Sequence, residues 1–136
     1  MDSSKKLFLQ TEHTHIECTE IILEELRESL EYLIYNVKRY KIPVTLVMFY
    51  SQEDITKLIQ DSKRLTDVLV TIKIGEAYFT FIYLLFTDLS DSDSFVKHVE
   101  YHKLRNIEYE FSYEQLKINE SQLYNFINGY LFRIGK

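Results

Sequence analysis

The sequence predicts an α+β protein of ferredoxin-like architecture, a βαββαβ antiparallel sheet between a long N-terminal helix and a C-terminal helix. One observation is the spacing of the apolar residues along the chain. It is typical first of a helix, then of the elements β-α-β-β-α-β, and finally of another helix. The other is that the first and third predicted strands are apolar on both faces, whereas the fourth alternates, as expected for central and edge strands. With 3 Gly, 1 Pro and no repeat or linker, residues 1–136 are expected to form one domain.

The first predicted helix spans residues 17–41. Its apolar residues alternate spacings of three and four: Leu23, Leu26, Leu30, Leu33 and Val37, extended by Ile16 and Tyr40. Acidic residues cluster early and basic residues come late, which suits the helix dipole at both ends. A dimeric coiled coil is one interpretation, but Ile22 and Ile34 occupy flanking positions where coiled coils usually carry charge. We therefore favour a helix packed on its own domain, with part of the stripe left for a second subunit.

The βαββαβ core is predicted over residues 43–113. Pro43 ends the helix and opens the strand PVTLVMFY, which is apolar on both faces. QEDITKLIQDSKR predicts a short amphipathic helix, and DVLVTIKI predicts the second strand. A tight turn at Gly75-Glu76 leads into AYFTFIYLLF, which is again apolar on both faces. The first half of the core is therefore a strand, a crossover helix and a hairpin.

The second half of the core is a helix followed by an edge strand. SDSDSF supplies capping residues for a helix through FVKHVEYHKL, with Phe95, Val99 and Leu104 as its inner row. IEYEFSY alternates strictly, and Glu108 and Glu110 suit an edge that must not pair with other chains. The two core helices cover one face of the sheet. We expect the long first helix to cover the other face, helped by the last helix or by a partner.

The last helix is predicted over residues 120–133. Asn119 is placed to cap it, together with Gln122 three residues on. The apolar residues that this helix is expected to bury are Leu123, Phe126, Ile127, Tyr130 and Leu131.

Composition and charge argue against several classes of protein. The net charge of -5 disfavours nucleic-acid binding, because phosphate affinity needs clustered Lys and Arg. The N-terminal segment has too few apolar residues for a signal peptide, and the longest apolar run, residues 79–86, is too short for a membrane helix. The single cysteine, Cys18, excludes an internal disulfide framework and suits a reducing compartment. We expect a cytoplasmic protein without nucleic-acid or membrane partners.

The stretch RLTDVLVTIKIGEAYFTFIYLLFTD resembles the diguanylate cyclase domain that is named for its GGDEF signature. In that family an RxTD precedes the hairpin, a basic residue and the signature follow, and an apolar strand ends in LLPxTD. The matching positions are Arg64, Thr66, Asp67, Lys73, Gly75, Phe79, Leu84, Leu85, Thr87 and Asp88. RYKIPVTLVMF also resembles the family's approach to its first strand, so the resemblance covers residues 20–104. It implies a nucleotide-cyclase-like fold with the signature on the second hairpin.

The departures from the family concern its chemistry. The signature positions hold Gly75, Glu76, Ala77, Tyr78 and Phe79. Glu76 replaces the glycine that lets the backbone approach a phosphate, and Ala77 and Tyr78 replace the two acidic residues. The first strand ends in MFYSQED where the family has an aspartate that holds a divalent cation. The resemblance therefore implies a domain without a two-metal site, which is inactive as a cyclase.

A second family feature lies at Arg64 and Asp67. An RxxD upstream of the signature acts in many members as an inhibitory site that binds the cyclic dinucleotide product. The seven residues between Asp67 and Gly75 form a longer spacing than is usual in the family. The simpler interpretation, which we favour, is that a helix-end Arg and a strand-start Asp form a surface pair.

Other chemically active side chains of the sequence are histidines, a cysteine and aromatic residues. His13, His15 and Cys18 cluster near the N-terminus, and His98 and His102 have helical i, i+4 spacing. HVEYH lacks the residue order of the metalloprotease motif, so we favour solvated histidines over a metal site. Cys18 near a helix start is open to a lowered thiol pKa, but a small residue facing the first turn is the simpler interpretation. The aromatic residues lack a basic lining and predict core positions.

The hypothesis we favour is a catalytically inactive GGDEF-like domain that serves bacterial signalling as a regulatory or protein-interaction module, with no metal and no cofactor. The alternative is a non-catalytic sensor of a cyclic dinucleotide or GTP, and the cyclic dinucleotide is the less favoured partner. Another type of enzyme is disfavoured because no convergent set of titratable residues appears on facing elements. For assembly we expect a homodimer through the long first helix or an uncovered sheet face.

Overall fold

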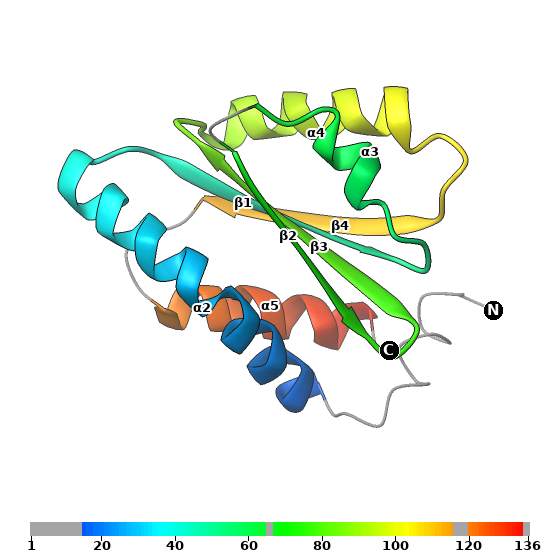
Figure 1. Cartoon of the computed structure of the whole chain (residues 1–136), viewed down its shortest axis with the longest axis horizontal. Coiled ribbons are helices and arrows are strands. Elements are labelled where there is room, and N and C mark those ends of the chain that lie inside the picture. Colours follow the sequence, from blue (N-terminus) through cyan, green and yellow to red (C-terminus); the bar gives the residue numbers. More distant parts are fainter. Residues whose placement is uncertain (1–14, 65–66, 116–119, 135–136) are drawn as a thin grey trace.

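The computed structural model describes residues 15–64, 67–115 and 120–134 (Figure 1). The elements are α2 (His15–Tyr40), β1 (Val44–Ser51), α3 (Thr56–Gln60), β2 (Val68–Ile74), β3 (Ala77–Leu85), α4 (Leu89–Lys103), β4 (Tyr109–Gln115) and α5 (Glu120–Ile134). The predicted α+β class and the predicted order of elements are confirmed.

The four strands form one antiparallel sheet in the order β2-β3-β1-β4. All eight residues of β1 are buried, and only the second and last residues of β3 are partly exposed. Val47 of β1 lies between Ile82 of β3 and Tyr113 of β4. The two strands that are apolar on both faces are therefore central, and β2 and β4 are the edges, as predicted.

Helices cover both faces of the sheet (Figure 1). α3 and α4 lie on one face, and α2 and α5 lie together on the other. The cover of the second face by the first and last helices is confirmed. The alternative route to a homodimer, through an uncovered sheet face, is wrong because α2 and α5 already occupy that face. Dimerisation through α2 stays a prediction.

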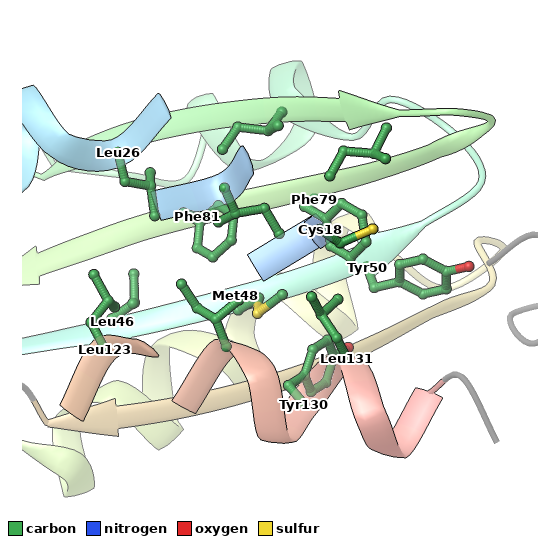
Figure 2. Packing of buried hydrophobic residues seen from close by; sticks show 14 of the residues in the cluster. Cys18, Leu26, Leu46, Met48, Tyr50, Phe79, Phe81, Leu123, Tyr130 and Leu131 are labelled. Carbon is green, nitrogen blue, oxygen red and sulfur yellow. The ribbon is translucent and has the colours of Figure 1, made fainter. Parts of the chain in front are cut away.

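The two faces of the central strands build two separate apolar clusters, because successive side chains of a strand point to opposite faces. Leu46, Met48 and Tyr50 of β1 face α2 and α5, and Val47 and Phe49 face α3 and α4. Figure 2 shows the first cluster, where Cys18 and Leu26 of α2 and Leu123 and Leu131 of α5 lie over Met48, Phe79 and Phe81. Burial of both faces explains why these strands contain almost continuous apolar runs.

The buried stripe of α2 differs from the predicted one. Among the α2 side chains that the structure describes, the fully buried apolar line consists of Cys18, Ile22, Leu26 and Leu33, whereas Ile16 is 55% exposed. α2 contacts both β2 and α5, and the Thr19 hydroxyl donates a hydrogen bond to Asn128 Oδ1 of α5 at 3.1 Å. Two neighbours bury a wider and slightly rotated sector of the helix, which is why Ile22 is a core residue and not a flanking one.

α3 is much shorter than its predicted segment. The carboxylate of Asp54 accepts a hydrogen bond from the backbone N–H of Thr56 at 3.0 Å, which makes a turn before the helix. Ile55, at the N-cap, provides no side-chain cap. A polar segment without a cap at its start therefore yields only five helical residues.

The ends of the later elements also differ from the prediction. α4 begins before the SDSDSF segment, because Asp88 caps it by accepting from the backbone N–H of Asp91 at 2.9 Å. Val96 is buried on its inner row with Val99, and Phe95 is only partly buried. β4 starts two residues later than predicted, and the predicted cap of α5 at Asn119 lies outside the described residues.

Among the described residues, none of the helices has the length and apolar character that are needed to cross a membrane.

Gly129 of α5 gives a first testable prediction. It lies on the exposed side of the helix, and a Cβ added there meets no atom within 4 Å. We expect Gly129→Ala to raise the free energy of unfolding by about 1 kcal/mol, because alanine loses less backbone entropy in a helix. Urea denaturation checks the change. Gly75→Ala is the matched control and should lower stability, because the φ of Gly75 is 60°.

Candidate functional site

The β2–β3 hairpin carries the positions that resemble the signature. Ile74 pairs with Ala77, so Gly75 and Glu76 form a two-residue loop. Gly75 has a φ of 60°, whereas Glu76 keeps a negative φ. A positive φ at the first central residue alone is the pattern of a type II′ turn, which requires glycine there. The turn geometry is thus sufficient to explain why Gly75 is a glycine.

The three positions after this loop make structural contacts. Ala77 and Phe79 are buried under α2 and α5, and the ring centroid of Phe79 lies 5.2 Å from that of Tyr50 (Figure 2). Tyr78 points to the opposite face, and the Nζ of its cross-strand partner Lys73 lies 5.5 Å from its ring centroid. A core alanine and a tyrosine in a cation–π contact therefore occupy the two acidic positions of the family signature.

The end of β1 lies beside this hairpin, since Ser51 pairs with Tyr78. The Ser51 hydroxyl is buried and donates to the carbonyl of Glu53 at 2.6 Å. Asp54 is exposed, and hydrogen bonds from the side chain and then the backbone of Thr56 lower the pKa of its carboxyl. Within the described ranges, His, Cys, Asp and Glu side chains form no group of three that could hold a metal ion.

Arg64 and Asp67 form a bidentate ion pair. Nη2 of Arg64 lies 2.9 Å from Oδ1 of Asp67, and its Nε lies 3.1 Å from Oδ2. The backbone N–H of Arg64 also donates to Oδ2 at 3.0 Å. The Asp67 side chain is fully buried, whereas the Arg64 side chain is 53% exposed. The predicted pair is present, but its description as a surface pair is wrong for Asp67, because a buried carboxylate is coupled to a guanidinium at the surface.

The same guanidinium reaches the end of β3. Nη2 of Arg64 donates to the Leu85 carbonyl and to the Thr87 hydroxyl, both at 2.6 Å, and Thr87 donates to Leu85 at 2.8 Å. Thr87 is tied to the start of β1, because its carbonyl accepts from the Thr45 hydroxyl at 2.8 Å and its N–H donates to Pro43 at 3.2 Å. We call Arg64, Asp67, Leu85 and Thr87 the Arg64 network.

A hollow of about 350 Å³ lies beside the Arg64 network. Its lining residues are Arg64, Leu84, Phe86, Thr87, Asp91, Ser94 and Phe95. Phe86 is 60% exposed and has a φ of 57°, so a bulky side chain holds a left-handed conformation at the mouth of the hollow. An exposed aromatic ring beside a guanidinium can contact a base and a phosphate, whereas Asp91 opposes an anion.

The hairpin and the Arg64 network lie at opposite ends of β3. Ala77 begins the strand directly after the loop, and Leu85 ends it at the network. At ~3.3 Å per residue, the strand separates the two by roughly 25 Å. The two stretches that resemble the family therefore form separate sites in this fold.

The histidines predicted to be solvated are exposed where they are described. His98 and His102 lie on the outer side of α4, with ring centroids 4.4 Å apart. His15 is the first residue of α2, and His13 lies outside the described residues. A closed zinc site needs further protein ligands, and within the described residues no third potential ligand joins this pair.

Cys18 is fully buried between α2 and the sheet (Figure 2). Burial, followed by the charge of Glu17, raises the pKa of its thiol to about 11. This direction is opposite to the lowered thiol pKa considered from the sequence, and Cys18 is a buried core residue of α2.

We expect the native thiol to react with Ellman's reagent about 100-fold more slowly than the urea-unfolded thiol at mildly alkaline pH, since few molecules carry the thiolate. Stopped-flow absorbance measures both rates. Equal rates in the two states would contradict the burial of Cys18.

The comparisons with known proteins reveal a shared fold. No protein-family model matches the chain, and no curated protein matches its sequence. Similar solved structures are fragments of PelD from Pseudomonas aeruginosa. The 156–455 fragment from strain PA14 without ligand has 16% identity and a TM-score of 0.53, over 62% of this chain and 36% of that one. The same fragment in complex with c-di-GMP has 15% identity and a TM-score of 0.59, over 76% and 44%.

A third PelD structure, from strain PAO1, has 16% identity and a TM-score of 0.52, over 62% of this chain and 35% of that one. The present chain thus corresponds to less than half the length of these PelD fragments. At such low identity, the similarity shows that the fold is shared.

Proposed function

We propose that the chain is a catalytically inactive GGDEF-like module that acts in bacterial signalling by binding a protein partner. The observation that carries this proposal is the composition of the β2–β3 hairpin. The turn requires the glycine at position 75, and the core requires the aromatic ring of Phe79. Ala77 and Tyr78, in contrast, offer no carboxylate to a metal ion. The end of β1 offers a buried serine in place of an acid. The fold shared with PelD supports the placement of the hairpin.

Incubation of the purified protein with GTP and Mg²⁺ or Mn²⁺ tests the absence of catalysis. We expect no cyclic dinucleotide by reversed-phase chromatography, because the two acidic positions of the family signature hold Ala77 and Tyr78, which supply no carboxylate to a divalent ion. An active diguanylate cyclase run in parallel proves that the assay detects product. Formation of a cyclic dinucleotide by this chain would refute the proposal.

A second candidate function is the binding of a cyclic dinucleotide without turnover. The observation that favours it is a PelD fragment in complex with c-di-GMP, a structure with which this chain shares its fold. The hollow beside Arg64 supports it, since Nη1 takes no part in the hydrogen bonds of the Arg64 network. Against it, Nε and Nη2 of Arg64 already donate within the chain. We therefore place this candidate second.

Isothermal titration calorimetry with c-di-GMP separates the two candidates. Binding at the hollow would give saturable heat that Phe86→Ala weakens, since the exposed ring of Phe86 is available for stacking. Tyr101→Ala removes a similarly exposed ring from α4, away from the hollow, and is the matched control. Under the first candidate, neither the natural chain nor either variant gives heat.

A further inference from the structure

A groove follows the outer edge of β4. A hollow of about 550 Å³ is lined by Glu100, Tyr109, Glu110, Phe111, Tyr130 and Arg133. Tyr109 and Phe111 belong to the face of β4 that α4 covers, and Glu110 belongs to the face that α5 covers. Side chains from both faces can line one hollow only where it passes around the strand's edge. Among the strands that the structure describes, β4 pairs with β1 and has no neighbour on its other side.

A second hollow of about 360 Å³ extends this groove along the strand. It shares Tyr130 and Arg133 with the first hollow and reaches Ser112 of β4 and Gly129 of α5. A Cβ at Gly129 would meet nothing within 4 Å, so the surface of α5 is open at this position. We call the two hollows together the β4 groove.

We propose that the β4 groove binds an extended segment of a partner protein, which adds to the sheet as a fifth strand beside β4. An edge strand presents unpaired backbone N–H and C=O groups, which such a segment can satisfy. This inference rests on the proposed protein-binding function and names its surface.

Helices flank the groove on both faces of β4, and contacts within the chain order several of the side chains that line it (Figure 1). On the α4 side the Tyr109 hydroxyl donates to Glu100, and the Tyr113 hydroxyl donates to Asp93 at 3.1 Å. On the α5 side Arg133 lies over the ring of Tyr130, with 5.6 Å between its Cζ and the ring centroid. These contacts hold side chains that line the groove, so fewer rotamers need to be ordered when a segment binds, which lowers the entropic cost of association.

The side chains beside the edge define the chemistry of the segment. Tyr109, Phe111 and Tyr113 form an aromatic row toward α4, against which apolar side chains can pack. Toward α5 the groove contains the Glu110 carboxylate, and acidic residues outnumber basic ones among the residues of the larger hollow. Charge complementarity therefore favours a segment that alternates apolar and basic residues.

A buried hydroxyl adds to this argument. Tyr130 is 3% exposed, and its hydroxyl makes no hydrogen bond within the part of the chain that the structure describes. Burial, followed by the charge of Glu110, raises the pKa of this hydroxyl, so it stays protonated. Buried polar atoms usually have a partner, and a lysine of the bound segment can donate to the Tyr130 oxygen.

A second copy of this chain fits the groove less well. Pairing β4 with β4 would bring Glu108 and Glu110 of both copies into one short interface. Like charges opposite one another destabilise strand pairs, and charged residues at sheet edges prevent self-association.

The test uses a blocked peptide of the length of β4 that alternates valine and lysine, titrated into the ¹⁵N-labelled full chain. We expect saturable amide shift changes centred on residues 109–115 and on Arg133. A peptide that alternates valine and glutamate should bind about tenfold more weakly or not at all. Equal binding of both peptides, shift changes elsewhere, or no binding would overturn the proposal. So would concentration-dependent dimerisation whose shift changes map to β4, because it would assign the groove to a second copy.

Two tryptophan substitutions separate blocking of the groove from loss of the fold. Gly129→Trp places a large ring in the groove on the exposed side of α5, and we expect it to weaken valine–lysine binding about tenfold or more. Glu28→Trp places the same ring on the exposed side of α2, outside both hollows, and is the matched control that keeps the affinity. Thermal melts followed by circular dichroism establish that both variants fold. If folded Gly129→Trp binds as well as Glu28→Trp, the groove is not the site.

The result is distinct from the test of catalysis. Turnover of GTP would refute the inactive module and leave peptide binding at β4 unaffected. Without turnover, the absence of peptide binding would refute the fifth-strand inference alone.

Discussion

We expect Phe79→Ala to lower the free energy of unfolding by about 3–5 kcal/mol, the usual cost of deleting a fully buried aromatic ring. Phe79 is 0% exposed, lies on a central strand, and packs beside Tyr50 under α2 and α5 (Figure 2). The cavity left by the ring cannot collapse easily, because the sheet and two helices enclose it. Urea denaturation followed by far-ultraviolet circular dichroism measures the loss.

Tyr78→Ala is the matched control, since Tyr78 is the adjacent residue of the same strand and points to the other face. It is partly exposed and contacts Lys73. We expect a loss of about 1 kcal/mol, within the range of partly exposed contacts. If the two variants lose similar stability, Phe79 is not the core residue that the structure describes.

Arg64→Ala should cost about 3 kcal/mol, because it leaves the Asp67 carboxylate buried without its cation. The Asp67 side chain is fully buried, and its carboxylate accepts two hydrogen bonds from the side chain of Arg64. The same substitution removes the guanidinium donor from the Leu85 carbonyl. Chemical denaturation of the variant measures the cost.

Two further variants show whether this cost comes from the buried carboxylate. Arg64→Ala combined with Asp67→Asn should lose less stability than Arg64→Ala alone, since the double variant carries no buried charge. Arg27→Ala removes an arginine from an exposed ion pair with Glu24, whose side chains are 62% and 70% exposed, and should cost about 0–1 kcal/mol. A double variant less stable than Arg64→Ala would contradict the assigned role of Asp67.

The sheet could be predicted from the sequence because strand alternation records how many faces of a strand are buried. The runs of β1 and β3 are apolar on both faces, which requires a helix layer on each side of the sheet. The two-residue loop at Gly75 was also recognisable, since few residues other than glycine take a φ of 60°. These features depend on local sequence and on the period of burial.

Features that depend on a third element could not be predicted in detail. The buried line of α2 runs through Ile22 because α5 lies beside it, and no pattern within residues 17–41 reports the position of α5. The cap of α4 moved to Asp88 because the Ser/Asp run offers several acceptors of similar quality. Local propensity predicts the existence of such a helix more accurately than it predicts the residue at which the helix begins.

The candidate sites could likewise be predicted only where they depend on local sequence. The pairing of Arg64 with Asp67 was available from their spacing, but the Leu85 carbonyl, a backbone acceptor, carried no signal in the sequence. The β4 groove was also missed, because it arises where two helices flank an edge strand. The signal that pointed toward it was Gly129, a glycine within an otherwise regular helical pattern.

The position of β1 at the centre of the sheet has a consequence for how the chain folds. β2 and β3 are neighbours in sequence and can pair early, whereas both partners of β1 lie far along the chain. β4 joins the sheet through β1 alone among the described strands, so it closes the longest loop. We therefore expect slow folding for a chain of this size, with the amides of β4 exchanging with solvent sooner than those of β3. The strand that borders the groove is thus expected to be the last to join the sheet and the first to leave it.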